Sequence, residues 1–389
     1  MPISALALAL TGLWLWRTDV MSTNSTIFAY PWDHHKYIAM ADGNPFGFHI
    51  APYCWRVGNP LLAKLLPFGS QTSFLLLAYG FVALTGTLSW LLARQAGFSR
   101  TLALTGLLFF FSLQWGPKFL LFDFWLPDAA ILALMTLAVL LLLRGNLVAF
   151  ALITAAGVAV KESMLFVLPL VYTFNAARLI DRRAALRTLL AGLPALTTFV
   201  VIRTAIPAWN DDPAYIATLP EQLWLVRDGG AEYDLLDALR EEARNRLARF
   251  DHNEARAYLF GTFGLAMTIL PFFALERNRL WFGRFLPFLL LIASQMLFGH
   301  DTERYLILSF PAWLIFALNG VSKLSARFRI DEWTWTLIPI TLMLFELVMR
   351  NPFILPLRYH ALALAIAICL AAAASHLRPG MAHERRIAT

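Results

Sequence analysis

The sequence predicts an all-α, polytopic integral membrane protein with one transmembrane domain over residues 1–389, and three observations carry this prediction. Hydrophobic residues make up 59% of the chain and charged residues only 15%, with a mean hydropathy of +0.62. Soluble domains have roughly 25% charged residues, so this chain could not cover an apolar core with polar surface in water. Apolar runs recur along the whole sequence, and basic residues separate them.

Apolar segments that could cross a bilayer number about twelve, within a range of about ten to thirteen. Several are shorter than the roughly 20 residues that a full crossing needs. The two that flank Lys161 are the clearest case, and we expect half-spans whose backbone groups are satisfied by protein or a water-filled cavity. The segments are 3–16, 72–92, 101–115, 126–143, 147–160, 164–177, 188–206, 258–275, 285–298, 305–321, 333–349 and 355–377.

The basic residues predict the orientation, because short cytoplasmic loops carry an excess of Lys and Arg. With the N-terminus inside, the inner segments hold 16 basic and five acidic residues, which is a net charge of +11. The rest of the chain has a net charge of −4, and the two values add up to the net charge of +7. We therefore expect cytoplasmic N- and C-termini, with the long polar segments outside. The inner basic residues are Arg94, Arg100, Arg144, Arg178, Arg182, Arg183, Arg187, Arg277, Arg279, Arg284, Lys323, Arg327, Arg329, Arg378, Arg385 and Arg386.

Two long polar segments fall on the outer side in this topology. The first covers residues 17–71, where we expect amphipathic helices, and the second covers residues 207–257. Leucines at near-helical spacing within 232–256 predict that the second segment is partly helical and lies over the membrane domain. Neither internal repeats nor low-complexity tracts occur.

Ionisable residues gather in four clusters on the outer side, where their proximity to a membrane needs a reason. Each has a plain structural interpretation, since loop charges cap helices and face water. The adjacent His34 and His35 could suggest a metal, but neighbouring side chains on a helix diverge, and no metal is indicated. Glu346, inside an apolar segment, is either buried with a partner or close to a misplaced boundary. The clusters are residues 30–37 with 51–60, then Lys118 with Asp123 and Asp128, then 160–163, then 300–305.

Taken together, the clusters bring carboxylates and cations from distant parts of the chain to one side. The cations include Lys36, Arg56, Lys118, Lys161 and Arg304. This mixture suits a reaction that needs one general base and several partners for a phosphate. Because nucleotide sugars are not supplied outside the cell, a phosphate-bearing donor there would be a lipid.

Four short motifs occur in the outer clusters. The first apolar segment is followed by Trp32-Asp33-His34-His35-Lys36-Tyr37, and the stretch 51–62 contains Pro-Tyr-x-x-Arg-Val-x-x-Pro-Leu. Residues 157–163 contain a Lys-Glu turn between two short apolar segments, and 301–305 contains Asp-x-x-Arg. In these motifs the sequence resembles uncharacterised bacterial members of the GT-C glycosyltransferases, which are multi-spanning enzymes that use lipid-phosphate-linked sugars. The likeness extends from residue 3 to about 321, but the motifs are short. The chain also departs from relatives that place two adjacent acids in the first loop, since His34 follows Asp33.

The resemblance implies an inverting transfer with Asp33 as the general base that deprotonates the acceptor hydroxyl. It implies a polyprenyl-phosphate sugar as donor, a glycan, lipid or protein as acceptor, and no cofactor. The donor phosphate would be bound by Lys161, Arg304 and Arg56. The donor or acceptor would be positioned by His34, Tyr37, Asp128, Glu162, His300 and Asp301.

Three further classes of function stay open or are excluded by the residues. A transporter or a lipid or oligosaccharide flippase would also have about twelve spans, although transporters usually show two related halves, which this chain lacks. An acyltransferase or polymer ligase would more readily centre on a histidine such as His300. Nucleic acid is excluded as a partner, because the basic residues punctuate apolar runs instead of forming one patch. We expect the protein in a bacterial inner membrane with its site on the periplasmic side.

Overall fold

Helices form every regular element in the part of the chain that the computed structural model describes, which is residues 2–30, 32–224, 244, 260–295, 302–348 and 357–376. Each of the apolar segments expected from the sequence overlaps one of these helices. The first half contains α1 (Ile3–Arg17), η1 (Thr26–Ala29), α2 (His34–Asp42), η2 (Tyr53–Trp55), α3 (Gly58–Leu65), α4 (Ser70–Gln95), α5 (Arg100–Phe111), η3 (Gln114–Lys118), α6 (Phe119–Phe122), α7 (Asp128–Leu143), α8 (Leu147–Val160), η4 (Glu162–Val167) and α9 (Leu168–Asn175).

The second half begins with a long helix whose outer surface is exposed and leucine-rich. The helices are α10 (Arg182–Ala205), α11 (Pro213–Ile216), α12 (Glu221–Trp224), α15 (Thr262–Ile269), η6 (Leu270–Ala274), α16 (Leu275–Ser294), α17 (Thr302–Leu306), η8 (Ile307–Ser309), α18 (Phe310–Phe328), α19 (Glu332–Trp335), α20 (Leu337–Val348) and α21 (Leu357–His376). Helix α16 begins at Leu275, well before the apolar segment expected at 285–298, so its first turns carry the basic residues expected in an inner loop.

Polar side chains begin several of the helices at the loops expected on the inner side. Ser99 accepts a hydrogen bond from the backbone N–H of Leu102 at the start of α5, and Asn146 accepts one at the start of α8. Asp181 accepts two at the start of α10. Such caps satisfy amide groups that have no partner within the helix, and they fix where each helix begins.

Three described helices are long and apolar enough to cross a membrane: Ser70–Gln95, Arg182–Ala205 and Glu303–Phe328. A fourth crossing is formed if Arg100–Phe111 and Gln114–Phe122, which are bent by 52° at their junction, count as one span. Shorter apolar helices cover Ile3–Arg17, Asp128–Leu143, Leu147–Val160 and Ala361–Ala373. The count of about twelve spans therefore stays a prediction.

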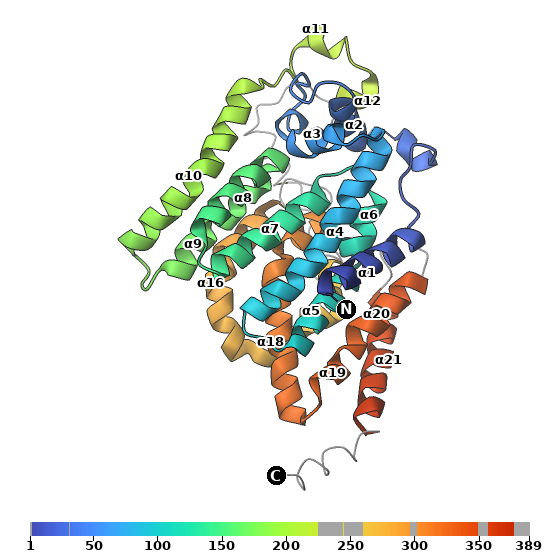
Figure 1. The fold of residues 1–389 in the computed structure, drawn as a ribbon, viewed down its shortest axis with the longest axis vertical. Coiled ribbons are helices and arrows are strands. Elements are labelled where there is room, and N and C mark those ends of the chain that lie inside the picture. Colours follow the sequence, from blue (N-terminus) through green and yellow to red (C-terminus); the bar gives the residue numbers. More distant parts are fainter. Residues whose placement is uncertain are drawn as a thin grey trace.

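Helix α7 lies among the other helices, and nearly its whole surface is buried. It packs against α4 and α8, and α8 packs in turn against α10 (Figure 1). Helix α18 contacts η6, α16, α5 and α4, while α20 pairs with α21. In Figure 1 the short helices α2, α3, α11 and α12 gather at one end of the molecule, at the top of the view, and the last helix points to the other end.

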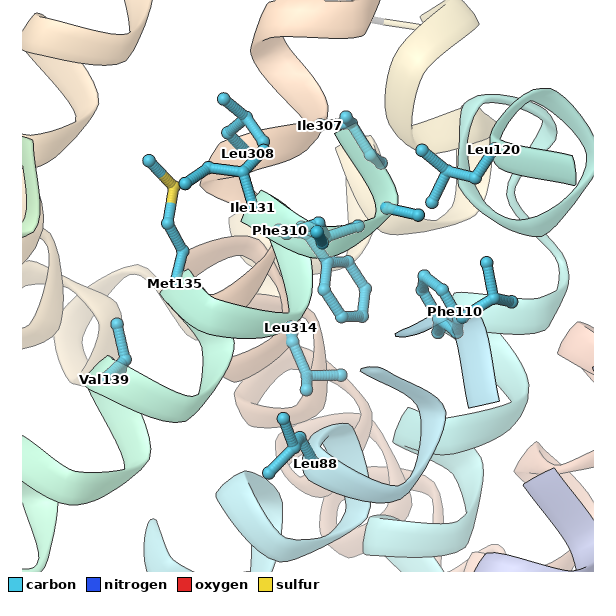
Figure 2. Packing of buried hydrophobic residues seen from close by; sticks show 14 of the residues in the cluster. Leu88, Phe110, Leu120, Ile131, Met135, Val139, Ile307, Leu308, Phe310 and Leu314 are labelled. Carbon is cyan, nitrogen blue, oxygen red and sulfur yellow. The ribbon is translucent and has the colours of Figure 1, made fainter. Parts of the chain in front are cut away.

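An apolar core joins α18 to α5 and α7, and it fixes the position of the chain just before α18. Figure 2 shows the side chain of Phe310 between Ile131 of α7 and Phe110 of α5, with Ile307 above it. All four are fully or almost fully buried, and η8 contacts α7 directly. Because interiors are close-packed, this core leaves little freedom to the residues that precede Ile307 in the chain. They include Arg304.

Candidate functional site

The first residue of α7, Asp128, joins two cations from distant parts of the chain. Its Oδ1 accepts a hydrogen bond from Lys161 Nζ at 2.9 Å, and its Oδ2 accepts one from Arg304 Nε at 2.7 Å. The exposed fraction of the side chain is 2% for Asp128, 2% for Lys161 and 6% for Arg304. A carboxylate at the first turn of a helix is also stabilised by the helix dipole. The result is a buried three-residue ion cluster.

Lys161 reaches Asp128 because the helix breaks at this residue. Helix α8 ends at Val160, Lys161 has an extended backbone (φ −162°, ψ 135°), and η4 begins at Glu162. The break folds η4 back onto α8 at Gly157, where a Cβ atom would lie 2.5 Å from Met164 Cγ. A side chain at residue 157 would therefore push the two helices apart. The short flanking segments in the sequence thus mark a real interruption of the helix.

The first polar segment contributes a second ion pair to the same place. The Arg56 guanidinium pairs with both carboxylate oxygens of Glu162, with Nε at 3.0 Å from Oε2, and donates to the Tyr37 hydroxyl at 3.3 Å. This contact depends on a close approach at Gly58, where a Cβ atom would lie 2.9 Å from Val160 Cγ2. The absence of a side chain at residue 58 therefore lets the loop lie directly against the broken end of α8.

Asp33, immediately before α2, is partly open to solvent, as is Glu162, whose side chain is 32% exposed. Asp33 Oδ1 accepts a hydrogen bond from the Tyr53 hydroxyl at 2.5 Å, and its Oδ2 lies 3.5 Å from Arg304 Nη1. Its side chain is 33% exposed. Burial by itself would raise the pKa of Asp33, but the Arg304 guanidinium, the Tyr53 hydrogen bond, Lys36 and Arg56 together hold the pKa below its ordinary value. Asp33 is therefore ionised at neutral pH and can accept a proton.

The two polar segments are held together by hydrogen bonds beside this network. The Trp209 N–H donates to the His49 carbonyl at 2.9 Å, and the Ala51 N–H donates to Asn210 Oδ1 at 2.8 Å. The Trp55 indole donates to the Ile206 carbonyl at 3.0 Å. Most of the second segment, from residue 225 to 257, lies outside the described residues apart from Arg244.

Seven of the residues that the sequence singled out form two hydrogen-bonded groups that meet where Lys161 precedes Glu162 and at the Tyr53 ring, and this network contains Asp33, Asp128, Lys161 and Arg304 in one group and Tyr37, Arg56 and Glu162 in the other. His34 is buried, and its Nε2 lies 3.1 Å from the Phe28 carbonyl oxygen. Burial lowers the pKa of His34 to about 4, so this ring is neutral. His300 and Asp301 lie outside the described residues.

Tyr53 and Lys36 belong to the site as well. From the sequence, Lys36 is only one of the cations of the clusters, and Tyr53 has no role. The Lys36 ammonium lies 4.9 Å from the centroid of the Tyr53 ring, whose hydroxyl binds Asp33. The spacing of Asp33 and Lys36, one helical turn apart, could have indicated Lys36. Tyr53 is the tyrosine of the Pro-Tyr-x-x-Arg pattern, but that pattern could not indicate its partner, because Tyr53 reaches Asp33 across 20 positions of the chain.

A second buried polar cluster lies between η3 and α20. The Gln114 amide donates to both carboxylate oxygens of Glu346, at 2.8 and 2.9 Å, and Lys118 Nζ lies 3.7 Å from Glu346 Oε2. Lys118, which the sequence grouped with Asp128, therefore pairs elsewhere. The structure decides between the two interpretations of Glu346 in favour of a buried residue with partners.

The charges of the network nearly balance. The three carboxylates Asp33, Asp128 and Glu162 lie among the four cations Lys36, Arg56, Lys161 and Arg304, and Arg203 lies near enough to Glu162 and Arg56 to interact with their charges. Among the described residues, no group of three or more His, Cys, Asp or Glu side chains could hold a metal ion. Glu162 has both oxygens held by Arg56, so Asp33 is the partly exposed carboxylate of the site that is available as a base beside buried cations.

No family model matches the chain, and no curated protein matches it. Among solved structures, the chain is similar to the archaeal oligosaccharyltransferase AglB from Archaeoglobus fulgidus in complex with an inhibitory peptide and a dolichol-phosphate. The identity is 14% and the TM-score 0.47, over 96% of this chain and 56% of AglB. The chain thus spans little more than half the length of AglB.

Proposed function

We propose that the protein is an integral membrane glycosyltransferase that transfers a sugar from a polyprenyl-phosphate donor to an acceptor at the outer face of the membrane. The observation that carries the proposal is that a partly exposed carboxylate, Asp33, lies beside buried cations from three separate parts of the chain, which are Arg56, Lys161 and Arg304. Ionisable groups at membrane depth are costly to bury, and such groups usually mark function.

In the proposed reaction, Asp33 accepts the proton of the acceptor hydroxyl as the hydroxyl oxygen attacks the anomeric carbon. The bond from that carbon to the phosphate oxygen breaks, the configuration inverts, and polyprenyl phosphate leaves with the bonding electrons. The Tyr53 hydroxyl occupies one oxygen of Asp33 at 2.5 Å, so the other oxygen, 3.5 Å from Arg304, is the one available to the acceptor. Hydrogen-bond geometry of this kind suits a general base.

The cations stabilise the charge that develops on the leaving phosphate. Arg304 and Arg56 are the proposed direct partners, because each extends from its carboxylate toward Asp33 or Tyr37. Lys161 donates to Asp128 and acts through it by holding the carboxylate that aligns Arg304. Glu162 aligns Arg56 in the same way, and Tyr37 fixes the guanidinium from the other side. His300 and Asp301, which precede α17, are retained as proposed positioning residues.

The experiment that tests the proposal is a screen of the purified protein against a panel of polyprenyl-phosphate sugars. We expect transfer with one member of the panel and a loss of about 10²- to 10⁴-fold in rate for Asp33→Asn, the usual contribution of a general base. Asp19→Asn, which changes an exposed acid of the same polar segment, is the matched control and should keep the wild-type rate. Wild-type transfer by Asp33→Asn would remove Asp33 from the mechanism, and no transfer with any donor would remove the function.

A further inference from the structure

One buried cation of the site, Lys36, differs from the others in its surroundings. It is the third residue of α2, and only 1% of its surface is exposed. Its ammonium lies 4.9 Å from the centroid of the Tyr53 ring, and the Arg56 guanidinium carbon lies 5.8 Å from the same centroid. The Tyr53 hydroxyl binds Asp33. Lys36 therefore lies beside the proposed base, with an aromatic ring as its neighbour.

The neighbouring cations each have a carboxylate partner. Lys161 and Arg304 share Asp128, and Arg56 has Glu162. Within the described residues, Lys36 has no carboxylate at ion-pair distance, and the electrostatic influence of Asp33 on it comes from farther away. Of these four cations, Lys36 is thus the one without a carboxylate partner among the described residues.

A buried ammonium without a counter-charge is unfavourable, because the attraction of an aromatic ring recovers only part of the lost hydration. The burial of Lys36 lowers its pKa, and Asp33 only partly restores it. An anion bound at this point would supply the missing charge. Lysine is a common phosphate ligand, where it acts as a point charge on a flexible stem.

We propose that Lys36 binds the phosphate group of the lipid-linked substrate. This inference rests on the proposed function and adds the anchor of the donor to it. The Lys36 N–H donates to the Asp33 carbonyl at 3.1 Å, so the two side chains belong to one turn of α2. A phosphate at Lys36 therefore lies about one helical turn along the chain from the base.

Binding measured without turnover tests the inference separately from sugar transfer. The full chain in nanodiscs of zwitterionic lipid is titrated with a polyprenyl phosphate, with the matching polyprenol and with inorganic phosphate. We expect Lys36→Gln to bind the polyprenyl phosphate about 10- to 100-fold more weakly than the wild type, the usual effect of losing a hydrogen bond to a charged group. Lys36→Arg should stay within a few fold. Lys64→Gln changes an exposed lysine of α3 and is the matched control, with no expected loss.

The same samples also show whether the variant folds and whether the bound phosphate belongs to a lipid or is free phosphate. Without ligand, Lys36→Gln should melt at the wild-type temperature or above it, because the substitution removes an uncompensated buried charge. A lower melting temperature would mean that the ammonium has a partner in the protein and would overturn the proposal. Wild-type affinity in Lys36→Gln, or equal binding of polyprenol and polyprenyl phosphate, would also overturn it. Inorganic phosphate that binds as tightly as the lipid, in a Lys36-dependent way, would refute a lipid ligand.

These measurements distinguish a failure of the inference about Lys36 from a failure of the proposed function. If Asp33 is the base, Asp33→Asn should abolish transfer but bind the polyprenyl phosphate at least as tightly as the wild type, because a negative charge near the phosphate is removed. Sugar transfer with Lys36-independent binding would refute the inference alone. Lys36-dependent binding without transfer from any donor would refute the function alone.

Discussion

Neutralising Asp128 should destabilise the protein more than any change to a surface ion pair. Its side chain is 2% exposed and holds Lys161 at 2.9 Å and Arg304 at 2.7 Å. Removing one partner of a buried ion pair typically costs about 3–5 kcal/mol, because the other charge is left buried without compensation. Asp128→Asn leaves two such cations, although Arg304 keeps its 3.5 Å contact with Asp33. We therefore expect a loss of at least about 3 kcal/mol in the free energy of unfolding.

The assay is equilibrium unfolding in mixed micelles with increasing denaturing detergent. The matched control is Glu276→Gln, which breaks the exposed pair with Lys323, whose side chains are 90% and 52% exposed. Exposed pairs contribute about 0–1 kcal/mol, so this control should unfold almost as the wild type does. Adding Lys161→Met to Asp128→Asn should restore part of the loss, since it removes one stranded charge. Equal stability of Asp128→Asn and Glu276→Gln would refute the reasoning, and so would a double variant less stable than Asp128→Asn.

Two further predictions concern the base and the orientation. Tyr53→Phe removes a hydrogen bond that lowers the pKa of Asp33, so this pKa should rise. The acidic limb of the pH profile of kcat/KM should then move to higher pH. If Tyr53 had a purely structural role, the variant would lower the rate at every pH without moving this limb. The orientation is tested by thiol labelling in a Cys369→Ser background, with a membrane-impermeant reagent added outside. The reagent should label Phe46→Cys, in the first polar segment, and should not label Leu179→Cys, between α9 and α10. Labelling of Leu179→Cys alone would invert the topology.

Much of the site could be predicted from the sequence because charges are rare in this chain. In an apolar context, an ionisable residue needs a partner or a function, so Asp128 and Lys161 stood out without any structure. The break at Lys161 was visible because the apolar segments on its two sides are too short to cross a membrane separately. In the structure, α8 ends at Val160 and η4 begins at Glu162, so the helix is interrupted at Lys161.

The pairing of the charges could not be predicted in the same way. Lys118 lies ten positions before Asp128 in the sequence, yet it pairs with Glu346 of α20, while Asp128 pairs with Arg304. Which cation meets which carboxylate depends on how α7, α18 and α20 pack, and packing depends on shape complementarity that no residue type encodes alone. The role of Tyr53, which reaches Asp33 across 20 positions, was hidden for the same reason.

By itself, the sequence determined the helical class, the apolar segments, the uneven distribution of basic residues and the small set of charges that need an explanation. These follow from the energy of transferring single side chains and backbone groups between water and an apolar medium, which is a local property. The tertiary structure alone decided that Asp33 keeps one third of its surface exposed and that Lys36 is buried beside it. Exposure and charge balance are set by all the elements around a residue together, so they exist only once the chain has folded.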